Sequence, residues 1–139
     1  MADIVETADN AGNFKTLLQL ILATELVEIL KSPGPYTVFA PTDEAFAKIP
    51  QGTLDSLLLN DLPKLKRILT YHVVFGDVRA EDLMQIEEAE TFEGSIIAVD
   101  TSDGIKVNDA KVIKPDILTD NGVIHIIDAV LIPAMVAAE

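Results

Sequence analysis

Residues 36–46 read Tyr-Thr-Val-Phe-Ala-Pro-Thr-Asp-Glu-Ala-Phe, and this stretch decides how the chain folds around it. Its first part, residues 36–40, is a run of β-branched, aromatic and small apolar residues, which is typical of a buried strand. Pro41 ends the run. Thr42 is a good N-cap for a following helix, and Asp43 lies where the helix dipole favours negative charge. The stretch therefore predicts a strand that passes directly into a helix.

Helices are predicted on both sides of this stretch. Upstream, four apolar residues fall on one helical face: Phe14, Leu17, Leu18 and Ile21. Thr24 is a candidate N-cap for a second short helix over residues 25–30. The helix after Thr42 is expected to bury Phe46 and to stop at Pro50. Three further helices are predicted, over residues 53–59, 61–69 and 81–85.

The second half of the chain is predicted to consist mainly of strands. They are expected over residues 70–75, 95–100, 104–107, 110–113 and 123–127, with residues 129–132 closing the fold. Asp103-Gly104 predicts a tight turn between two of them, and Asn121-Gly122 leads into the last. Helices come mainly first and strands mainly last, so the fold class is α+β. We find no repeat or linker and expect a single domain over residues 1–139.

Composition limits the kinds of partner. The chain has 23 Asp and Glu against 10 Lys and Arg, a formal net charge of −13, which repels nucleic-acid phosphates and anionic membrane surfaces. It has no Cys, which excludes disulfides and thiolate metal sites. No apolar run approaches the roughly 20 residues of a spanning helix. We therefore expect neither nucleic-acid binding nor membrane insertion.

No pattern for catalysis stands out. The seven glycines are too scattered for a phosphate-binding loop, and no Gly-x-Ser-x-Gly occurs. The run that begins at Asp100 faintly resembles a calcium loop, but Ile105 and Lys111 stand where such a loop needs Gly and Glu. We expect no catalytic residues, no metal site and no cofactor, and so a protein that is not an enzyme.

The two histidines both lie in apolar surroundings. His125 stands in Val-Ile-His-Ile-Ile, a strand that is apolar on both faces until Asp128. We expect a buried, neutral side chain held by hydrogen bonds. His72 follows Tyr71 at a helix-to-strand junction, where it could pack in the fold or contact a partner, and the sequence leaves both open.

Three segments, in order and with fitting spacing, resemble the fasciclin I domain family. Residues 36–46 resemble its first signature. Residues 121–133, Asn-Gly-Val-Ile-His-Ile-Ile-Asp-Ala-Val-Leu-Ile-Pro, resemble its second, and residues 68–72, Ile-Leu-Thr-Tyr-His, resemble the motif between them. The match covers nearly the whole chain and implies helices packed on a β-wedge or sandwich. The motif residues to which it assigns a structural role are Thr42, Asp43, Phe46, Asn121, Gly122, His125 and Asp128.

The resemblance also implies a function: adhesion, or another extracellular interaction with a cell-surface or matrix protein, without catalysis. In matrix members, two segments have been linked to integrin binding. The matching candidate residues here are Tyr71, His72, Pro115, Asp116 and Ile117. Lys114 stands where the integrin-linked version has an acidic residue, which favours a single-domain microbial member. Packing in the fold remains the alternative for both segments, and a carrier of an apolar small molecule such as a pigment remains the alternative function.

The expected compartment follows from the same resemblance. Met1-Ala2-Asp3 has neither a basic start nor an apolar stretch, so no signal peptide is present in this sequence. The chain is then either cytoplasmic or the mature form of an exported protein. The resemblance implies the second, a secreted, periplasmic or cell-surface protein.

Overall fold

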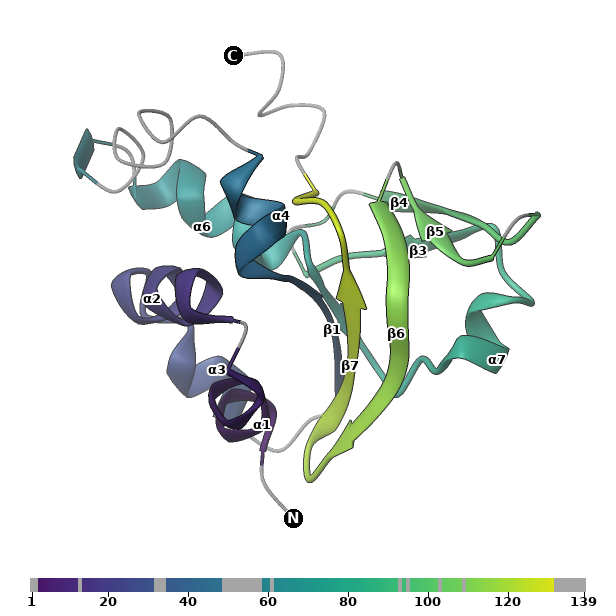
Figure 1. Ribbon diagram of the computed structural model, residues 1–139, viewed down its shortest axis with the longest axis horizontal. Helices are drawn as coiled ribbons and strands as arrows, with labels where there is room; N and C mark the ends of the chain where they lie inside the picture. The colour runs from purple at the N-terminus through teal and green to yellow at the C-terminus, as the bar shows by residue number, and fades with distance from the viewer. Residues whose placement is uncertain are drawn as a thin grey trace.

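A computed structural model describes residues 3–12, 14–31, 35–48, 59–60, 62–92, 94, 96–102, 104–108 and 110–131. The fold is α+β, with helices of the N-terminal half packed on a mixed sheet formed mainly by the C-terminal half (Figure 1). The helices are α1 (Ile4–Ala11), α2 (Lys15–Ala23), α3 (Val27–Lys31), α4 (Asp43–Ala47), α6 (Leu62–Thr70) and α7 (Ala80–Leu83). The strands are β1 (Tyr36–Pro41), β2 (Val73–Phe75), β3 (Glu88–Glu90), β4 (Ile96–Asp100), β5 (Lys106–Val107), β6 (Ala110–Thr119) and β7 (Gly122–Ile127).

Strands β1 and β7 form the centre of the sheet, whose order is β2-β1-β7-β6-β5-β4-β3. They run parallel, with Phe39 opposite His125. Because side chains alternate between the two faces of a strand, β1 and β7 each contribute side chains to two apolar cores, one on either face of the sheet. Val38 and Ile124 pack with the N-terminal helices, while Phe39 and Ile127 pack with α7 and strands β4 to β6. Burial on both faces explains why these two segments read as nearly continuous apolar runs.

The helical half contains one element that the sequence did not predict and one cap that it misplaced. Helix α1 has no predicted counterpart. The N-cap assigned to Thr24 is wrong, because the Thr24 hydroxyl donates to the carbonyl oxygen of Leu20 at 2.8 Å and so finishes α2 instead. Helix α3 begins later, at Val27. The helix predicted over residues 53–59 lies almost wholly outside the described residues.

Two features of the strand-rich half also differ from the prediction. Strands β4 and β5 form the expected hairpin, but Asp100 lies opposite Lys106, so residues 101–105 connect them in place of a two-residue turn. The strand expected to end at Ile113 continues to Thr119, because two irregularities let β6 stay paired with β7. Among the described helices, none is long and apolar enough to cross a bilayer.

Candidate functional site

The candidate partner-binding segment Pro115-Asp116-Ile117 lies at an irregularity of β6. The register pairs on either side are Lys114 with Ile126 and Ile117 with Ile124. Pro115 and Asp116 therefore both stand against a single residue of β7, His125, and we call these two residues the β6 bulge. Asp116 has a φ of 58°, in the left-handed region that Asp tolerates better than most residues. Both bulge residues are exposed, and Ile117 is half-buried.

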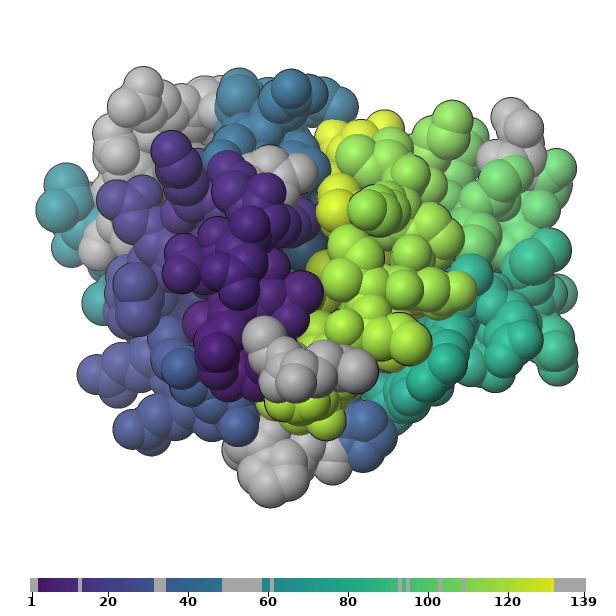
Figure 2. All heavy atoms as spheres, turned by 60° about the horizontal axis from the view of Figure 1, so that its bottom comes forward, coloured from purple at the N-terminus to yellow at the C-terminus, as the bar shows by residue number. Residues whose placement is uncertain are grey.

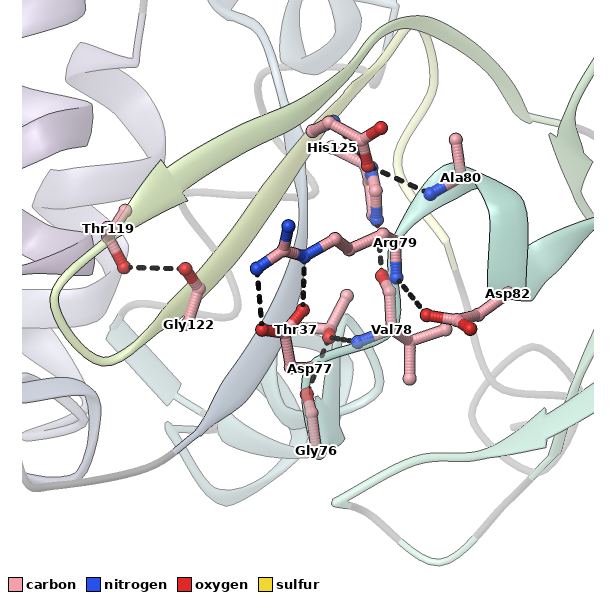
Figure 3. Close-up of polar contacts among 11 residues, drawn as sticks. Thr37, Gly76, Asp77, Val78, Arg79, Ala80, Asp82, Thr119, Gly122 and His125 are labelled. Atoms are coloured by element: carbon pink, nitrogen blue, oxygen red, sulfur yellow. Dashed lines mark hydrogen bonds and ion pairs between the residues drawn. The ribbon is translucent and has the colours of Figure 1, made fainter.

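His125 joins the β6 bulge to a loop of residues 76–79. Its Nδ1 accepts the backbone N–H of Asp116 at 3.1 Å, so the ring proton lies on Nε2, which donates to the carbonyl oxygen of Val78 at 2.7 Å (Figure 3). The ring is fully buried and stacks on Phe39, with centroids 5.5 Å apart. Burial lowers the pKa of His125, and the bond from Asp116 requires the neutral ring, because only an unprotonated Nδ1 can accept it.

The same loop is held by two more strands. Thr37 of β1 donates its hydroxyl to the carbonyl oxygen of Gly76 at 2.7 Å and accepts the N–H of Val78 at 2.8 Å. Asp116 of β6 accepts the N–H of Ala80, the first residue of α7, through Oδ1 at 2.8 Å. Figure 3 shows Thr37 and His125 reaching the loop at Val78. Three strands of the sheet therefore fix the segment that leads from β2 into α7.

The charged side chains of this loop face solvent. The guanidinium of Arg79 donates to both carboxylate oxygens of Asp77, with distances of 3.0 Å for Nε–Oδ1 and 3.2 Å for Nη2–Oδ2 (Figure 3). Hydrogen bonding to Asp77 raises the pKa of Arg79. An exposed pair of this kind contributes little to stability. Its effect is to place a fixed, self-neutralised charge pair beside the β6 bulge.

Tyr71 occupies a different place from the β6 bulge. Its side chain is buried in the core formed with β4 to β6. The hydroxyl donates to the carbonyl oxygen of Ile96 at 2.9 Å and accepts from Nδ2 of Asn108, also at 2.9 Å. The phenol therefore joins the α6–β2 junction to the β4–β5 hairpin. For Tyr71 the structure supports the packing alternative, because almost none of the side chain is open to a partner.

His72 is also buried and makes two hydrogen bonds. Its Nε2 accepts the N–H of Leu131 at 2.8 Å, so Nδ1 carries the proton and donates to the carbonyl oxygen of Ile68 at 2.8 Å. Burial lowers the pKa of His72 to about 4. The ring thereby ties the segment after β7 to the end of α6. For His72, too, the structure supports the alternative of packing in the fold. Neither of its two hydrogen bonds reaches the β6 bulge.

The motif residues at the ends of β7 tie this strand to its neighbours. Asn121 accepts the N–H of Ile4 at 3.0 Å and donates to the last turn of α3 at 2.6 Å. Gly122 pairs so closely with β1 that any Cβ would overlap the backbone there. Asp128 accepts the N–H of Lys111 through Oδ1 at 2.8 Å. These residues fix β7 in the sheet.

The first motif connects α4 to the helical layer. Thr42 accepts the N–H of Ala45 at 3.2 Å, which is the cap that the sequence predicts. Asp43 accepts the N–H of Thr16 at 2.8 Å, near the start of α2. Burial acts to raise the pKa of Asp43, but the hydrogen bonds from Thr16 and Lys15 and the charge of Lys15 together outweigh it, and the pKa lies below its usual value. Phe46 is buried in the helix-side core.

The size of the cavities can be compared with what a carrier of an apolar small molecule would need. An apolar cavity of about 20 Å³ lies among α2, α3, β1 and α6. This is close to the space of one water molecule, whereas pockets for organic ligands measure about 300–1,000 Å³. A groove of about 540 Å³ between the end of α7 and β4 is open to solvent. Within the described residues, then, the apolar cavity is too small for a pigment, and no group of three His, Cys, Asp or Glu side chains is arranged to hold a metal.

The fold is that of a FAS1 domain. The structure matches a FAS1 domain pair from the insect cell adhesion molecule Fasciclin I with a TM-score of 0.68, covering 88% of this chain and 46% of that one. At 23% sequence identity this likeness is one of fold. Residues 12–133 match the Fasciclin domain, and the chain belongs to the Fasciclin domain family. The family expected from the three sequence motifs is thereby confirmed.

Relatives occur in bacteria and animals. An uncharacterized protein of Synechocystis sp., sll1735, is 51% identical over 132 residues, which cover 95% of this chain and 98% of that protein. Immunogenic protein MPB70 of Mycobacterium bovis is 40% identical, over 83% of this chain and 58% of its own length. Human periostin is 37% identical over 94% of this chain, which corresponds to 15% of periostin.

The sequence did not single out Thr37 or the 76–79 loop as part of the site. Thr37 follows Tyr36 in an otherwise apolar buried strand, and its short, buried hydroxyl is the one local signal that could have drawn attention to it. A buried hydroxyl needs a partner, and here the partner is the loop.

Proposed function

We propose that this chain is a single-domain, non-catalytic interaction module for adhesion, and that it works as a secreted, periplasmic or cell-surface protein. Its contact surface for a cell-surface or matrix protein is the β6 segment 113–118. Membership of the Fasciclin domain family supports the adhesive role. The observation that carries the choice of surface is the exposure of two large apolar side chains on either side of the β6 bulge, Ile113 at 54% and Leu118 at 45%.

Exposed apolar side chains on a rigid segment are suited to anchor a partner. Most of the binding energy of an interface comes from a few such side chains, while rim charges mainly affect the rate of association. The β6 bulge is held by His125 and by the start of α7, so little conformational entropy is lost when a partner binds. In Figure 2 the green residues of β6 lie open between the purple N-terminal helices and teal α7.

The edge of β6 favours recognition through side chains over strand addition. Strand β5 pairs with only Ala110 and Lys111, so in the described part of the chain no strand pairs with the outer edge of residues 113–118. Pro115 lacks an N–H, the bulge interrupts the ladder, and Lys114 is charged, and all three features oppose pairing with a foreign strand. A partner would then contact the projecting Ile113, Lys114 and Leu118.

Asp116 has a positioning role in this proposal. One oxygen of its carboxylate already accepts the N–H of Ala80, and its own N–H is donated to His125. The residue therefore fixes the shape of the β6 bulge. Asp116 is exposed, so its second carboxylate oxygen could still accept a bond from a partner.

The test is attachment of beads coated with the protein to cultured cells and to a film of matrix protein. We expect the double variant Ile113→Ser, Leu118→Ser to reduce attachment about tenfold, which corresponds to about 1.4 kcal/mol. Its melting temperature should stay close to that of the wild type, because both side chains are largely exposed.

The matched control is Leu22→Ser, which removes an exposed apolar side chain from α2. It should leave attachment unchanged. Equal losses in the control and the double variant would mean nonspecific hydrophobic adsorption. Full attachment of the double variant would place the contact surface elsewhere on the domain.

A further inference from the structure

One of the contacts that shape the proposed contact surface requires a neutral His125, whereas the bond from Nε2–H to Val78 forms in both protonation states. Nδ1 accepts the N–H of Asp116, and Nε2 donates to the carbonyl oxygen of Val78. A protonated imidazole has two N–H donors and no acceptor. The added proton binds at Nδ1, because that nitrogen alone has a lone pair available. It then points at the N–H of Asp116, so a hydrogen bond is replaced by the contact of two donors.

We propose that His125 is an acid-sensitive latch, which holds the β6 bulge on the sheet while neutral and releases the bulge when it is protonated. Release separates the N–H of Asp116 from the ring and frees the bulge to change its φ of 58°. The effect on partner binding rests on the proposed function of residues 113–118. The opening of the latch does not depend on that proposed function, and it can be measured without a partner.

The charges around His125 determine where the ring finds a new partner after protonation. The charged groups on the elements packed near it are Asp116 on β6, Asp77 and Arg79 in the loop, and Asp82 on α7, while β1 contributes uncharged Thr37 and Phe39. Arg79 is engaged with Asp77. Asp116 is thus the acceptor best placed for the new Nδ1–H. Its carboxylate would give up the N–H of Ala80 for a charge-assisted bond to the ring, which loosens the first turn of α7.

The direction of the pH effect follows from burial. Burial lowers the pKa of His125 below the usual value, so the closed latch binds fewer protons than the open one. The closed form is therefore favoured above the usual His pKa of about 6.5 and loses stability as the pH falls below it. The hydrogen bond to Val78 and the charges of Asp116 and Asp77 act on the pKa in the opposite direction to burial and favour the charged ring. His72 has no such carboxylate, so we expect His125 to accept its proton first.

Amide hydrogen exchange tests the latch on the intact chain. The reporters are the N–H groups of Asp116 and Ala80, and the references are those of Tyr36 and Leu30, which bond within the core. After correction for the intrinsic pH dependence of exchange, we expect protection of the reporters to fall at least about tenfold relative to the references between about pH 7 and about pH 5. Protonation of the His125 ring, followed by NMR, should accompany this loss of protection.

A non-titrating variant separates the latch from general loosening. In His125→Gln, the side-chain amide offers one acceptor and one donor, and its charge does not change with pH. Protection of Asp116 and Ala80 should then be independent of pH. The control His72→Gln changes the other buried histidine and should leave the pH-dependent loss in place. If H125Q does not fold, the wild-type titration alone decides the question.

Three results would overturn the proposal. In the first, reporters and references lose protection together, which means global unfolding. In the second, the reporters stay protected while the ring titrates. In the third, the ring does not titrate before the protein unfolds. Bead attachment at the two pH values is a separate readout. If the latch opens and attachment does not change, only the link between the latch and partner binding is contradicted. The attachment of the Ile113→Ser, Leu118→Ser variant tests the proposed function alone and not the latch.

Discussion

Asn121 and Ile4 lie 117 residues apart, yet Oδ1 of Asn121 accepts the backbone N–H of Ile4 at 3.0 Å. The same side chain donates from Nδ2 to the carbonyl oxygen of Leu30 at 2.6 Å. The first N–H groups of a helix and its last carbonyls have no partners within the helix. One buried amide therefore satisfies a group at the start of α1 and another at the end of α3, and fixes both helices to the start of β7.

Replacing Asn121 should separate the helices from the sheet. Asn121→Ala leaves a buried N–H and a buried C=O without their partner, and we expect the free energy of unfolding to fall by about 2 to 4 kcal/mol. Urea denaturation measures the change. The control Asn10→Ala alters an exposed residue of α1 and should stay within about 0.5 kcal/mol of the wild type. Similar losses in the two variants would contradict the role given to Asn121.

Gly122 is required by the close approach of two backbones. A Cβ at this position would overlap the carbonyl group of Tyr36. We expect Gly122→Ala to destabilise by about 3 kcal/mol or more, because β1 and β7 would have to separate at the centre of the sheet. Gly104→Ala is the comparison, since it has a φ of 76° but no neighbouring atoms in the way, and should cost about 1 to 2 kcal/mol. Thermal melts showing equal losses would remove the steric argument.

Tyr71 tests the packing alternative against the binding one. Tyr71→Phe keeps the ring but removes the hydroxyl, so the carbonyl of Ile96 and the amide of Asn108 each lose a bond. We expect a loss of about 1 to 2 kcal/mol in stability. Attachment of the folded variant should equal that of the wild type. Reduced attachment at unchanged stability would return Tyr71 to the candidate binding residues.

His72 should make the fold sensitive to acid. Its pKa is about 4 in the folded chain and about 6.5 when unfolded, so between these values the unfolded state binds more protons. Stability from this residue is complete above about pH 6.5 and falls as the pH drops towards 4, by on the order of 3 kcal/mol. Unfolding measured against pH for wild type and His72→Gln should show the two curves converging in acid. Parallel curves would mean that His72 does not titrate on unfolding.

The sequence by itself determined the elements whose signals are local. The apolar run at residues 36–40 predicts a strand, and the hydroxyl of Thr42 before Asp43 predicts the start of α4, because strand burial and helix capping depend on neighbouring residues. Thr24 shows the limit of such signals. A threonine can satisfy either end of a helix, and only the position of its backbone shows that this one closes α2.

The tertiary structure alone decided which groups meet. Val-Ile-His-Ile-Ile indicates that His125 is buried, but its partners come from residue 116 on β6 and residue 78 in the loop before α7. In the same way, an exposed carboxylate at Asp116 reads as a free binding group until the fold places Ala80 against it. Hydrogen bonds between distant segments depend on register, bulges and strand order. These are set by how the two cores pack, and no short stretch of sequence carries that information.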